Sequence, residues 1–222
     1  MPADAFRLDS DGILRCNGFQ QFDWQRHGFG TKDASPHADV TLRQVHSSTV
    51  RNAAGLSDRQ SDGDALISNQ NGLAIGIRTA DCVPLLLLDC RNRAVAAVHA
   101  GWRGSAANIV NQALSAMHDS FGSDPKDVYA AIGPCIRACC YEVGLDVAQQ
   151  FSAQFPEWPP LQGRAKLDLA EANRRQLRAG GVASESIFDS RLCTACAPDL
   201  LFSYRREPDN PGRMVAAIAR LR

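Results

Sequence analysis

Continuous hydrophobic runs, rather than alternating ones, dominate the middle of the chain. Three such runs follow one another at residues 73–78, 83–88 and 94–100, with short polar segments between them. A strand that is apolar at every position is typical of a sheet covered on both faces. Because the connection at residues 90–93 is short and polar, we expect the second and third runs to pair as an antiparallel hairpin.

A helical pattern follows these runs. Apolar residues at positions 109, 110, 113, 114 and 117 share one face of a predicted helix that Gly122 ends. Asp168 and Glu171 resemble a capping box, which opens a second helix that we expect to reach Leu177 and to end at Gly180. Shorter strand candidates lie at residues 6–15, 24–30, 40–45, 65–67, 128–132, 187–188 and 214–219. Helices and strands are thus interspersed, which predicts an α+β fold with a mixed sheet.

Length and charge limit the possible classes of protein. The chain has 222 residues and no internal repeat or linker, so we expect residues 1–222 to form a single domain. Its 24 basic and 24 acidic residues give a formal net charge of +0. This balance argues against nucleic acid or an anionic membrane as the main partner, because both attract clustered positive charge.

Membrane and secretion signals are lacking in the sequence pattern. The longest strongly apolar run, residues 83–88, is far shorter than the ~20 residues of a membrane helix. The first residues lack the basic and then apolar pattern of a signal peptide, so we expect a cytoplasmic protein. In a reducing compartment, we expect the eight cysteines to be free thiols, of which one or two at most do chemistry.

Three potential metal ligands, His46, Cys82 and His99, lie in three separate segments. Two imidazoles and one thiolate suit zinc, and three protein ligands leave the fourth position open, as in a catalytic zinc site. Each residue also has an ordinary interpretation: a core histidine for His99, a buried apolar thiol for Cys82, and a surface residue for His46. Only the tertiary fold can bring the three together.

Other side chains are weaker candidates for chemistry. Asp81 is costly to bury unless it has a partner or transfers a proton. Cys193 and Cys196 have the spacing of half a zinc knuckle, but no second such pair completes it. Partners for a second metal site would have to come from Cys135, Cys139 and Cys140, and we treat that site as the less favoured interpretation.

Several motifs occur together in the order and spacing of one family. They are Arg43-Gln44-Val45-His46, Asp62-Gly63-Asp64-Ala65, Thr79-Ala80-Asp81-Cys82-Val83-Pro84, Ala97-Val98-His99-Ala100-Gly101-Trp102-Arg103-Gly104, Ala131-Ile132-Gly133-Pro134-Cys135-Ile136 and Phe202-Ser203-Tyr204-Arg205-Arg206. With these motifs, the chain resembles the laccase-domain or polyphenol-oxidase family from about His27 to Arg213. That family includes bacterial peptidoglycan-editing factors and enzymes described as purine nucleoside phosphorylases.

The resemblance implies a layered α/β/β/α sandwich. It also implies that His46, Cys82 and His99 bind one zinc ion per chain, or sometimes copper, in a cleft. One departure concerns the segment between Thr31 and Arg43, which is usually longer and glycine-rich in the family. We expect a more open pocket or a shifted specificity if that segment covers the substrate.

The leading hypothesis is a zinc enzyme that splits purine nucleosides, including methylthioadenosine, with phosphate and that deaminates adenosine. Its partners would be small molecules, a nucleoside and phosphate. Asp81 is the candidate for moving a proton during deamination. The candidates for binding the substrate and its anion are Arg43, Gln44, Arg103 and Arg205.

Four alternatives remain open. A peptidoglycan-editing amidase would use the same metal to remove a misincorporated amino acid from a nucleotide-linked muramic acid precursor. A metal-free hydrolase would use Cys82 as nucleophile and His99 as base. A multicopper oxidase needs several His-x-His pairs, which this chain lacks, although one copper in the three-ligand site would allow weak phenol oxidation. A binding module would use the cluster for structure alone.

Overall fold

A hairpin of β7 (Val83–Asp89) and β8 (Val95–Ala100) lies at the centre of the computed structural model, which describes residues 5–209 and 212–222. The two strands are antiparallel, with Val83 opposite Ala100 and Leu88 opposite Val95. Every residue of both strands is buried, as expected for a sheet covered on both faces. The predicted hairpin is therefore confirmed.

This hairpin is extended on both sides into a mixed sheet of six strands. Their order is β12-β9-β7-β8-β5-β4, and the outer pairs β12·β9 and β5·β4 are parallel while the inner pairs are antiparallel. The added strands are β4 (Val50–Asn52), β5 (Ala65–Ser68), β9 (Val128–Ile132) and β12 (Ile187–Asp189).

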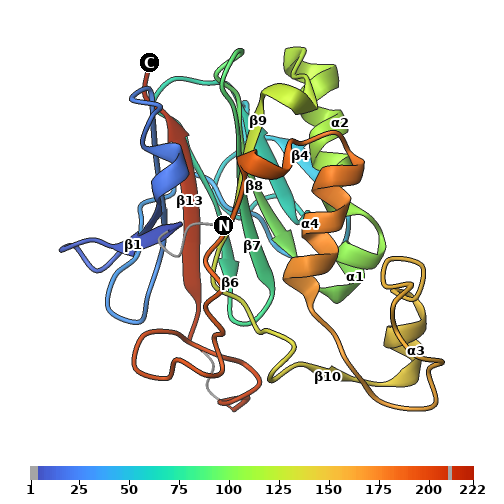
Figure 1. The fold of residues 1–222 in the computed structure, drawn as a ribbon. Coiled ribbons are helices and arrows are strands. Elements are labelled where there is room, and N and C mark those ends of the chain that lie inside the picture. Colours follow the sequence, from blue (N-terminus) through green and yellow to red (C-terminus); the bar gives the residue numbers. More distant parts are fainter. Residues whose placement is uncertain (1–4, 210–211) are drawn as a thin grey trace.

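A second sheet packs against the first and contains both ends of the described chain. Its strands are β1 (Phe6–Leu8), β2 (Leu14–Cys16), β3 (Gln25–Phe29), β6 (Ala74–Thr79) and β13 (Met214–Arg220). Their order is β1-β2-β3-β13-β6, with every pair antiparallel. Figure 1 shows the C-terminal strand β13, in red, beside the N-terminal segments in blue.

The two faces of β7 explain its continuous hydrophobic pattern. Leu86 and Leu88 point into the core between the two sheets, whereas Leu85 and Leu87 point into the core between the six-stranded sheet and the helices. Each of these side chains is fully buried, and burying a leucine contributes about 1.5–3 kcal/mol. Both hydrophobic cores therefore depend on this one strand.

The helices cover the outer face of the six-stranded sheet (Figure 1). They are α1 (Trp102–Ala106), α2 (Ile109–Phe121) and α4 (Leu169–Ala179), while the short α3 (Leu145–Gln149) lies beyond them with the two-stranded ribbon of β10 (Glu142–Val143) and β11 (Ala165–Lys166). The fold is thus an α+β domain with a mixed sheet, as predicted.

Both predicted helices form, and their ends follow the expected signals. Gly122 ends α2 in the left-handed region at φ 71°, where glycine carries no steric penalty. Asp168 caps α4 by accepting a hydrogen bond from the backbone N–H of Glu171 at 3.0 Å. The Glu171 side chain does not close the predicted capping box, because it bonds to Arg175 one turn further along.

The outer face of the five-stranded sheet differs from the expected α/β/β/α layering. No α-helix of the described residues covers it, and residues 34–38 lie on it instead. A Cβ atom on Gly28 would lie 2.5 Å from Ile13, and one on Gly76 would lie 2.7 Å from Ala38. Glycine at position 76 therefore lets residues 34–38 lie directly on the sheet, and Gly28 leaves room for the side chain of Ile13.

The predicted strand at residues 40–45 is wrong, and residues 6–15 form parts of two antiparallel strands, β1 and β2, instead of one. The segment 40–45 makes only isolated bridges, at Val40 and Arg43, and side chains satisfy other parts of its backbone. Asp58 accepts a hydrogen bond from the backbone N–H of Thr41 at 2.8 Å. These local hydrogen bonds take the place of the continuous strand pairing that the apolar pattern predicted.

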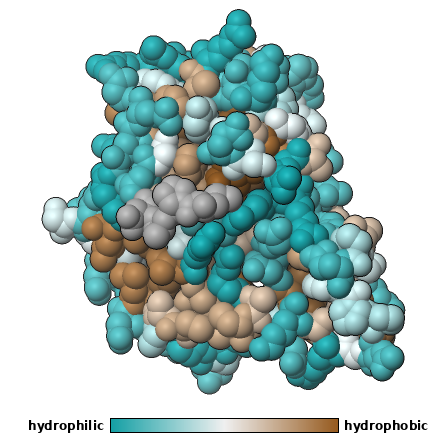
Figure 2. All heavy atoms as spheres, viewed as in Figure 1, coloured by the Kyte–Doolittle hydropathy of each residue, from teal (hydrophilic) through white to brown (hydrophobic). Residues whose placement is uncertain are grey.

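The helices are short, and most of the visible surface is hydrophilic. None of the helices in residues 5–209 and 212–222 is long and apolar enough to cross a membrane. Figure 2 shows hydrophilic side chains over most of the visible face, with hydrophobic ones gathered in a smaller area at the lower left.

His27 on β3 is a neutral core histidine. Its Nε2 accepts a hydrogen bond from the backbone N–H of Cys16 at 2.9 Å, and its Nδ1 lies 2.9 Å from Oε1 of Gln25. Burial, followed by the nearby positive charges of Arg15 and Arg7, lowers the pKa of His27 to about 4. Protonation would remove the acceptor that the Cys16 amide requires.

We predict that His27 makes folding weaken in mild acid. Because its pKa is lower in the folded state than in the unfolded state, the unfolded chain binds the extra proton first, and stability is lost as the pH falls from about 6.5 to about 4. The free energy of unfolding of wild type should fall relative to that of a His27→Gln variant by about 3 kcal/mol over this range. Denaturant titrations of both proteins at several pH values check this, and parallel pH profiles would contradict it.

Candidate metal centre

The central hairpin brings Cys82 and His99 to the same end of the sheet. Cys82 directly precedes β7, and His99 is the penultimate residue of β8, opposite Pro84. Because the strands are antiparallel, the beginning of one meets the end of the other. His46 reaches the same place from the loop before β4, with its backbone in the left-handed region at φ 59°.

The three predicted ligands converge. Each of the three side chains offers one ligand atom, and these atoms of His46, Cys82 and His99 all lie within 4.8 Å of one another. The planes of the two imidazole rings make an angle of 75°, and their centroids are 5.0 Å apart. Gly101 makes this approach possible, since a Cβ there would lie 3.1 Å from both the Cys82 sulfur and Cδ2 of His46. Two nitrogens and one sulfur form a donor set that zinc accepts.

Asp64, which sequence analysis missed, connects two of the ligands. Its Oδ1 lies 2.8 Å from Nδ1 of His99 and accepts the backbone N–H of His46 at 3.0 Å. Its Oδ2 accepts from the backbone N–H and the hydroxyl of Ser47, at 2.6 and 2.8 Å, and from the N–H of Val45 at 3.3 Å. The carboxylate thus holds the His46 loop and orients the His99 ring.

This dense hydrogen bonding offsets the cost of burying a charge. Asp64 is completely buried, and burial alone would raise its pKa, but hydrogen bonds from His99 and Ser47 lower it overall. A buried carboxylate is tolerated when such donors replace water. With Nδ1 of His99 facing Asp64, Nε2 remains for a metal ion, an arrangement common to metal-binding histidines.

Cys82 and His99 also affect each other's charge. Burial would raise the pKa of Cys82, but hydrogen bonds to His46 and His99 lower it to about 6. Burial would lower the pKa of His99, but Asp64 and then Cys82 raise it to about 9. The sulfur is therefore a thiolate at neutral pH, the form that binds metals and attacks electrophiles.

Asp81 occupies a constrained position beside Cys82. Its backbone has φ 89°, in a region that favours glycine, and its carboxylate is almost buried. Oδ1 accepts from the hydroxyl of Thr194 at 2.5 Å, and Oδ2 accepts from the backbone N–H of Arg205 at 2.6 Å. These two bonds fix the carboxylate and connect it to the C-terminal segment before β13.

A cleft of about 880 Å³ opens above the three ligands. This volume falls in the range of ~300–1,000 Å³ that is typical of small-molecule sites. Its lining combines the ligands and Asp81 with aromatic and basic side chains, which are Trp102, Tyr141, Tyr204, Arg59, Arg78, Arg205 and Arg213. Such a lining suits a flat ring and an anion.

The four predicted substrate-binding residues occupy different positions. Arg205 and Gln44 line the cleft, but both polar ends of the Gln44 amide bond to the backbone of Arg78, each at 2.8 Å. Arg43 pairs with Asp62 at 2.8 Å, and Arg103 stacks on Trp102 at 4.3 Å from its ring centroid. Neither Arg43 nor Arg103 lines the cleft.

Sequence reasoning missed several other residues of this site. Asp64 was named only within the motif Asp62-Gly63-Asp64-Ala65, and no local pattern marked Arg78 or Tyr141. Burial, followed by the negative charge of Cys82, raises the pKa of Tyr141 to about 12, so its phenol keeps its proton. Arg205 lies over the Tyr141 ring at 5.3 Å.

Comparison with solved structures gives close matches over nearly the whole chain. YfiH of Bacillus licheniformis matches with a TM-score of 0.87 and 27% identity, covering 97% of this chain and 99% of that one. YlmD of Geobacillus stearothermophilus matches with a TM-score of 0.86 and 29% identity, covering 99% and 100%.

Sequence relatives carry names of enzymes that act on nucleosides. A purine nucleoside phosphorylase of Bacteroides thetaiotaomicron is 41% identical over 161 residues, which are 70% of this chain and 60% of the relative. The chain thus spans less than two thirds of that protein. A protein named adenosine deaminase, from an unknown prokaryotic organism, is 39% identical over 196 residues, covering 82% of this chain and 74% of the relative.

The family comparison agrees with these matches. A family model described as multi-copper polyphenol oxidoreductase laccase matches residues 26–221. The chain therefore belongs to this laccase-like family.

Proposed function

We propose that this protein is a zinc-dependent purine nucleoside phosphorylase that also deaminates adenosine and cleaves methylthioadenosine with phosphate. The observation that carries the proposal is the convergence of two imidazoles and one thiolate below a cleft lined by arginines and aromatic rings. The names of the relatives point to the same substrate class.

The donor set fits one zinc ion. His46, Cys82 and His99 would hold it through two nitrogens and one sulfur, leaving a position open toward the cleft. When bound, zinc would supply a Lewis acid that activates water for attack on the purine ring. Copper takes the same donors, so copper loading would account for weak phenol oxidation.

Asp81 is the proposed proton carrier in deamination. It lines the cleft beside Cys82, and Thr194 and Arg205 fix its carboxylate. The carboxylate would take a proton from the attacking water and return it to the amino group, which leaves as ammonia.

Arginines and aromatic rings would position the substrate. Arg205 and Arg78 line the cleft and would neutralise phosphate, whereas Arg43 and Arg103 are engaged with Asp62 and Trp102. The exposed ring of Tyr204 offers a surface for the purine. In phosphorolysis, a phosphate oxygen bonds to the sugar carbon as the bond to the purine nitrogen breaks, and the proton that the phosphate loses goes to the leaving purine.

One observation favours a second candidate. Cys82 is a thiolate hydrogen-bonded to His99, and this pair has the composition of a cysteine nucleophile with its base. A metal-free hydrolase would use the same cleft. Metal content separates the two candidates, because only the zinc enzyme requires a bound ion for turnover.

We predict that a Cys82→Ala variant loses about one zinc ion per chain relative to wild type and at least about 100-fold in phosphorolysis of inosine and deamination of adenosine. Elemental analysis of protein purified without added metal and nucleoside assays measure both effects. Equal zinc content in the two proteins would contradict the site. Turnover of a nucleotide-linked muramic acid precursor alone would instead identify the amidase.

We predict that Asp64→Asn lowers zinc affinity at the three-ligand site by about 10- to 100-fold. In the wild type, both carboxylate oxygens of Asp64 accept hydrogen bonds. In the variant, an NH₂ group replaces one of these oxygens and cannot accept, so the His46 loop and the His99 ring lose the anchor that they share. Competition with a chromophoric chelator measures the affinity. The matched control is Asp62→Asn, because Asp62 lies in the same turn but pairs with Arg43 at the surface.

We predict that Asp81→Asn lowers the turnover number for adenosine by about 10²- to 10⁴-fold while zinc stays bound. Asparagine keeps the shape, accepts from the Arg205 amide and can donate to the Thr194 hydroxyl, so the loss reports proton transfer. Steady-state kinetics beside zinc analysis check this. Full deaminase activity in a variant with bound zinc would exclude the role of Asp81.

A further inference from the structure

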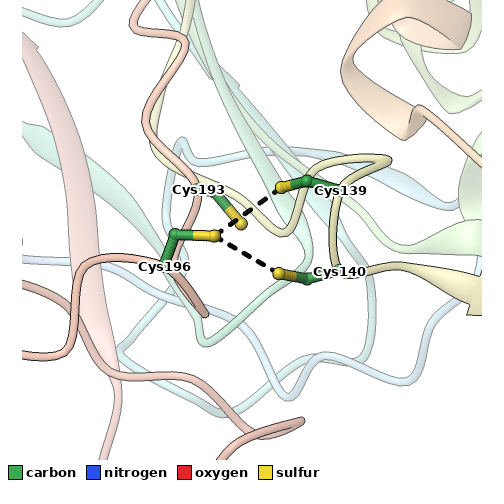
Figure 3. Close-up of side chains that lie close together, drawn as sticks. All are labelled: Cys139, Cys140, Cys193 and Cys196. Atoms are coloured by element: carbon green, nitrogen blue, oxygen red, sulfur yellow. Dashed lines mark hydrogen bonds between the residues drawn. The ribbon is translucent and has the colours of Figure 1, made fainter.

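Four cysteines outside the cleft form a second cluster. The sulfurs of Cys139, Cys140, Cys193 and Cys196 lie within 4.8 Å of one another. Figure 3 shows that the pair Cys193 and Cys196 approaches the pair Cys139 and Cys140 from a separate segment of the chain. The sequence made such a site the less favoured interpretation, because no second Cys-x-x-Cys pair completes the motif of Cys193 and Cys196.

The six-stranded sheet explains why these segments meet. The first pair follows β9 and the second follows β12, and these two strands are parallel neighbours. The chain therefore leaves both strands at the same end of the sheet. An isolated parallel bridge between Cys135 and Cys193 continues the pairing beyond the strands.

The arrangement of the sulfurs fits a metal ion better than disulfides. The Cys196 sulfur lies 3.7 Å from that of Cys139 and 3.3 Å from that of Cys140. In a tetrahedral site with zinc–sulfur bonds of about 2.3 Å, sulfurs lie about 3.8 Å apart. A disulfide joins sulfurs one to one, whereas here one sulfur faces two others.

We propose that Cys139, Cys140, Cys193 and Cys196 bind a structural zinc ion through four thiolates, separate from the catalytic site. Four protein sulfurs complete a tetrahedron and leave no open position, which is the mark of a structural site. Such a site binds its ion for stability, not for chemistry on a substrate.

Groups near the four cysteines can stabilise the negative charge of a cluster of thiolates. Burial raises the pKa of the Cys193 thiol, but nearby backbone N–H donors of Arg137, Cys196 and Ala195 lower it overall. The Lys166 ammonium lies 3.5 Å from the backbone carbonyl oxygen of Cys139. Four thiolates carry more negative charge than one zinc ion neutralises, so such donors and a nearby cation stabilise the site.

The zinc would cross-link two walls of the cleft. Tyr141, which lines the cleft, directly follows the first cysteine pair. Thr194, which fixes Asp81, lies between the cysteines of the second pair. Arg206 bonds to the carbonyl oxygens of Thr194 and Ala195 at 2.8 and 3.2 Å, which extends the connection to the C-terminal segment.

The decisive experiment measures zinc in a Cys82→Ala background, where the proposed catalytic site has lost its thiolate. Cys82→Ala protein purified without added metal should retain about one zinc per chain, and a further Cys196→Ser substitution should remove it. Cys90→Ser in the same background is the matched control, because Cys90 is a free cysteine outside both clusters, and it should leave the zinc in place.

A second measurement does not depend on the folding of the Cys196→Ser variant. Cobalt exchanged into Cys82→Ala protein should give the intense thiolate charge-transfer and visible bands of tetrahedral four-sulfur coordination. Folded Cys82→Ala protein without metal, or with these four cysteines in two disulfides, would overturn the proposal. Iron in place of zinc would overturn the choice of ion. The result is independent of the nucleoside assays, so either proposal can fail alone.

Discussion

The candidate active site depends on one buried carboxylate. Asp64 has no contact with solvent, and its two oxygens accept bonds from the loop that carries His46 and from the ring of His99. Hydrogen bonds to a charged group contribute about 1.5–3 kcal/mol each, and an unpaired buried charge costs several. The burial of this charge therefore depends on both elements, which ties the positions of the His46 loop and the His99 ring to the stability of the fold.

The sandwich supplies the rigid frame for this anchor. β7 contributes leucines to both cores, and its pairing with β8 places Cys82 and His99 at one end of the sheet. The cleft walls come from less regular segments, which are tied to each other by side chains such as Asp81 and, in our proposal, by the four-cysteine zinc site. Functional side chains at the ends of rigid strands and on the loops that those strands position are a common arrangement in enzymes.

The family name and the geometry of this chain suggest different chemistry. The family model carries the description of a multi-copper laccase, but the first of the two clusters holds three ligands of mixed type, and the chain has no His-x-His pair for a relay of several coppers. In our proposal, a single ion beside the Asp81 carboxylate and a basic, aromatic cleft fits hydrolytic deamination and phosphorolysis better than electron transfer. The names of the relatives agree with that preference.

Local pattern was sufficient for the central strands and the two longest helices. Continuous apolar runs predicted β6, β7 and β8, and helical periodicity with Gly122 and Asp168 predicted α2 and α4, because burial and capping act over a few neighbouring residues. Residue chemistry and motif order indicated His46, Cys82 and His99.

Tertiary structure alone decided the rest: that Asp64 joins the segments of His46 and His99, that Arg78 rather than Arg43 lines the cleft, and that two distant cysteine pairs meet beside β9 and β12. These contacts join residues far apart in the chain, and their register depends on how whole strands pair, which no short stretch of sequence encodes.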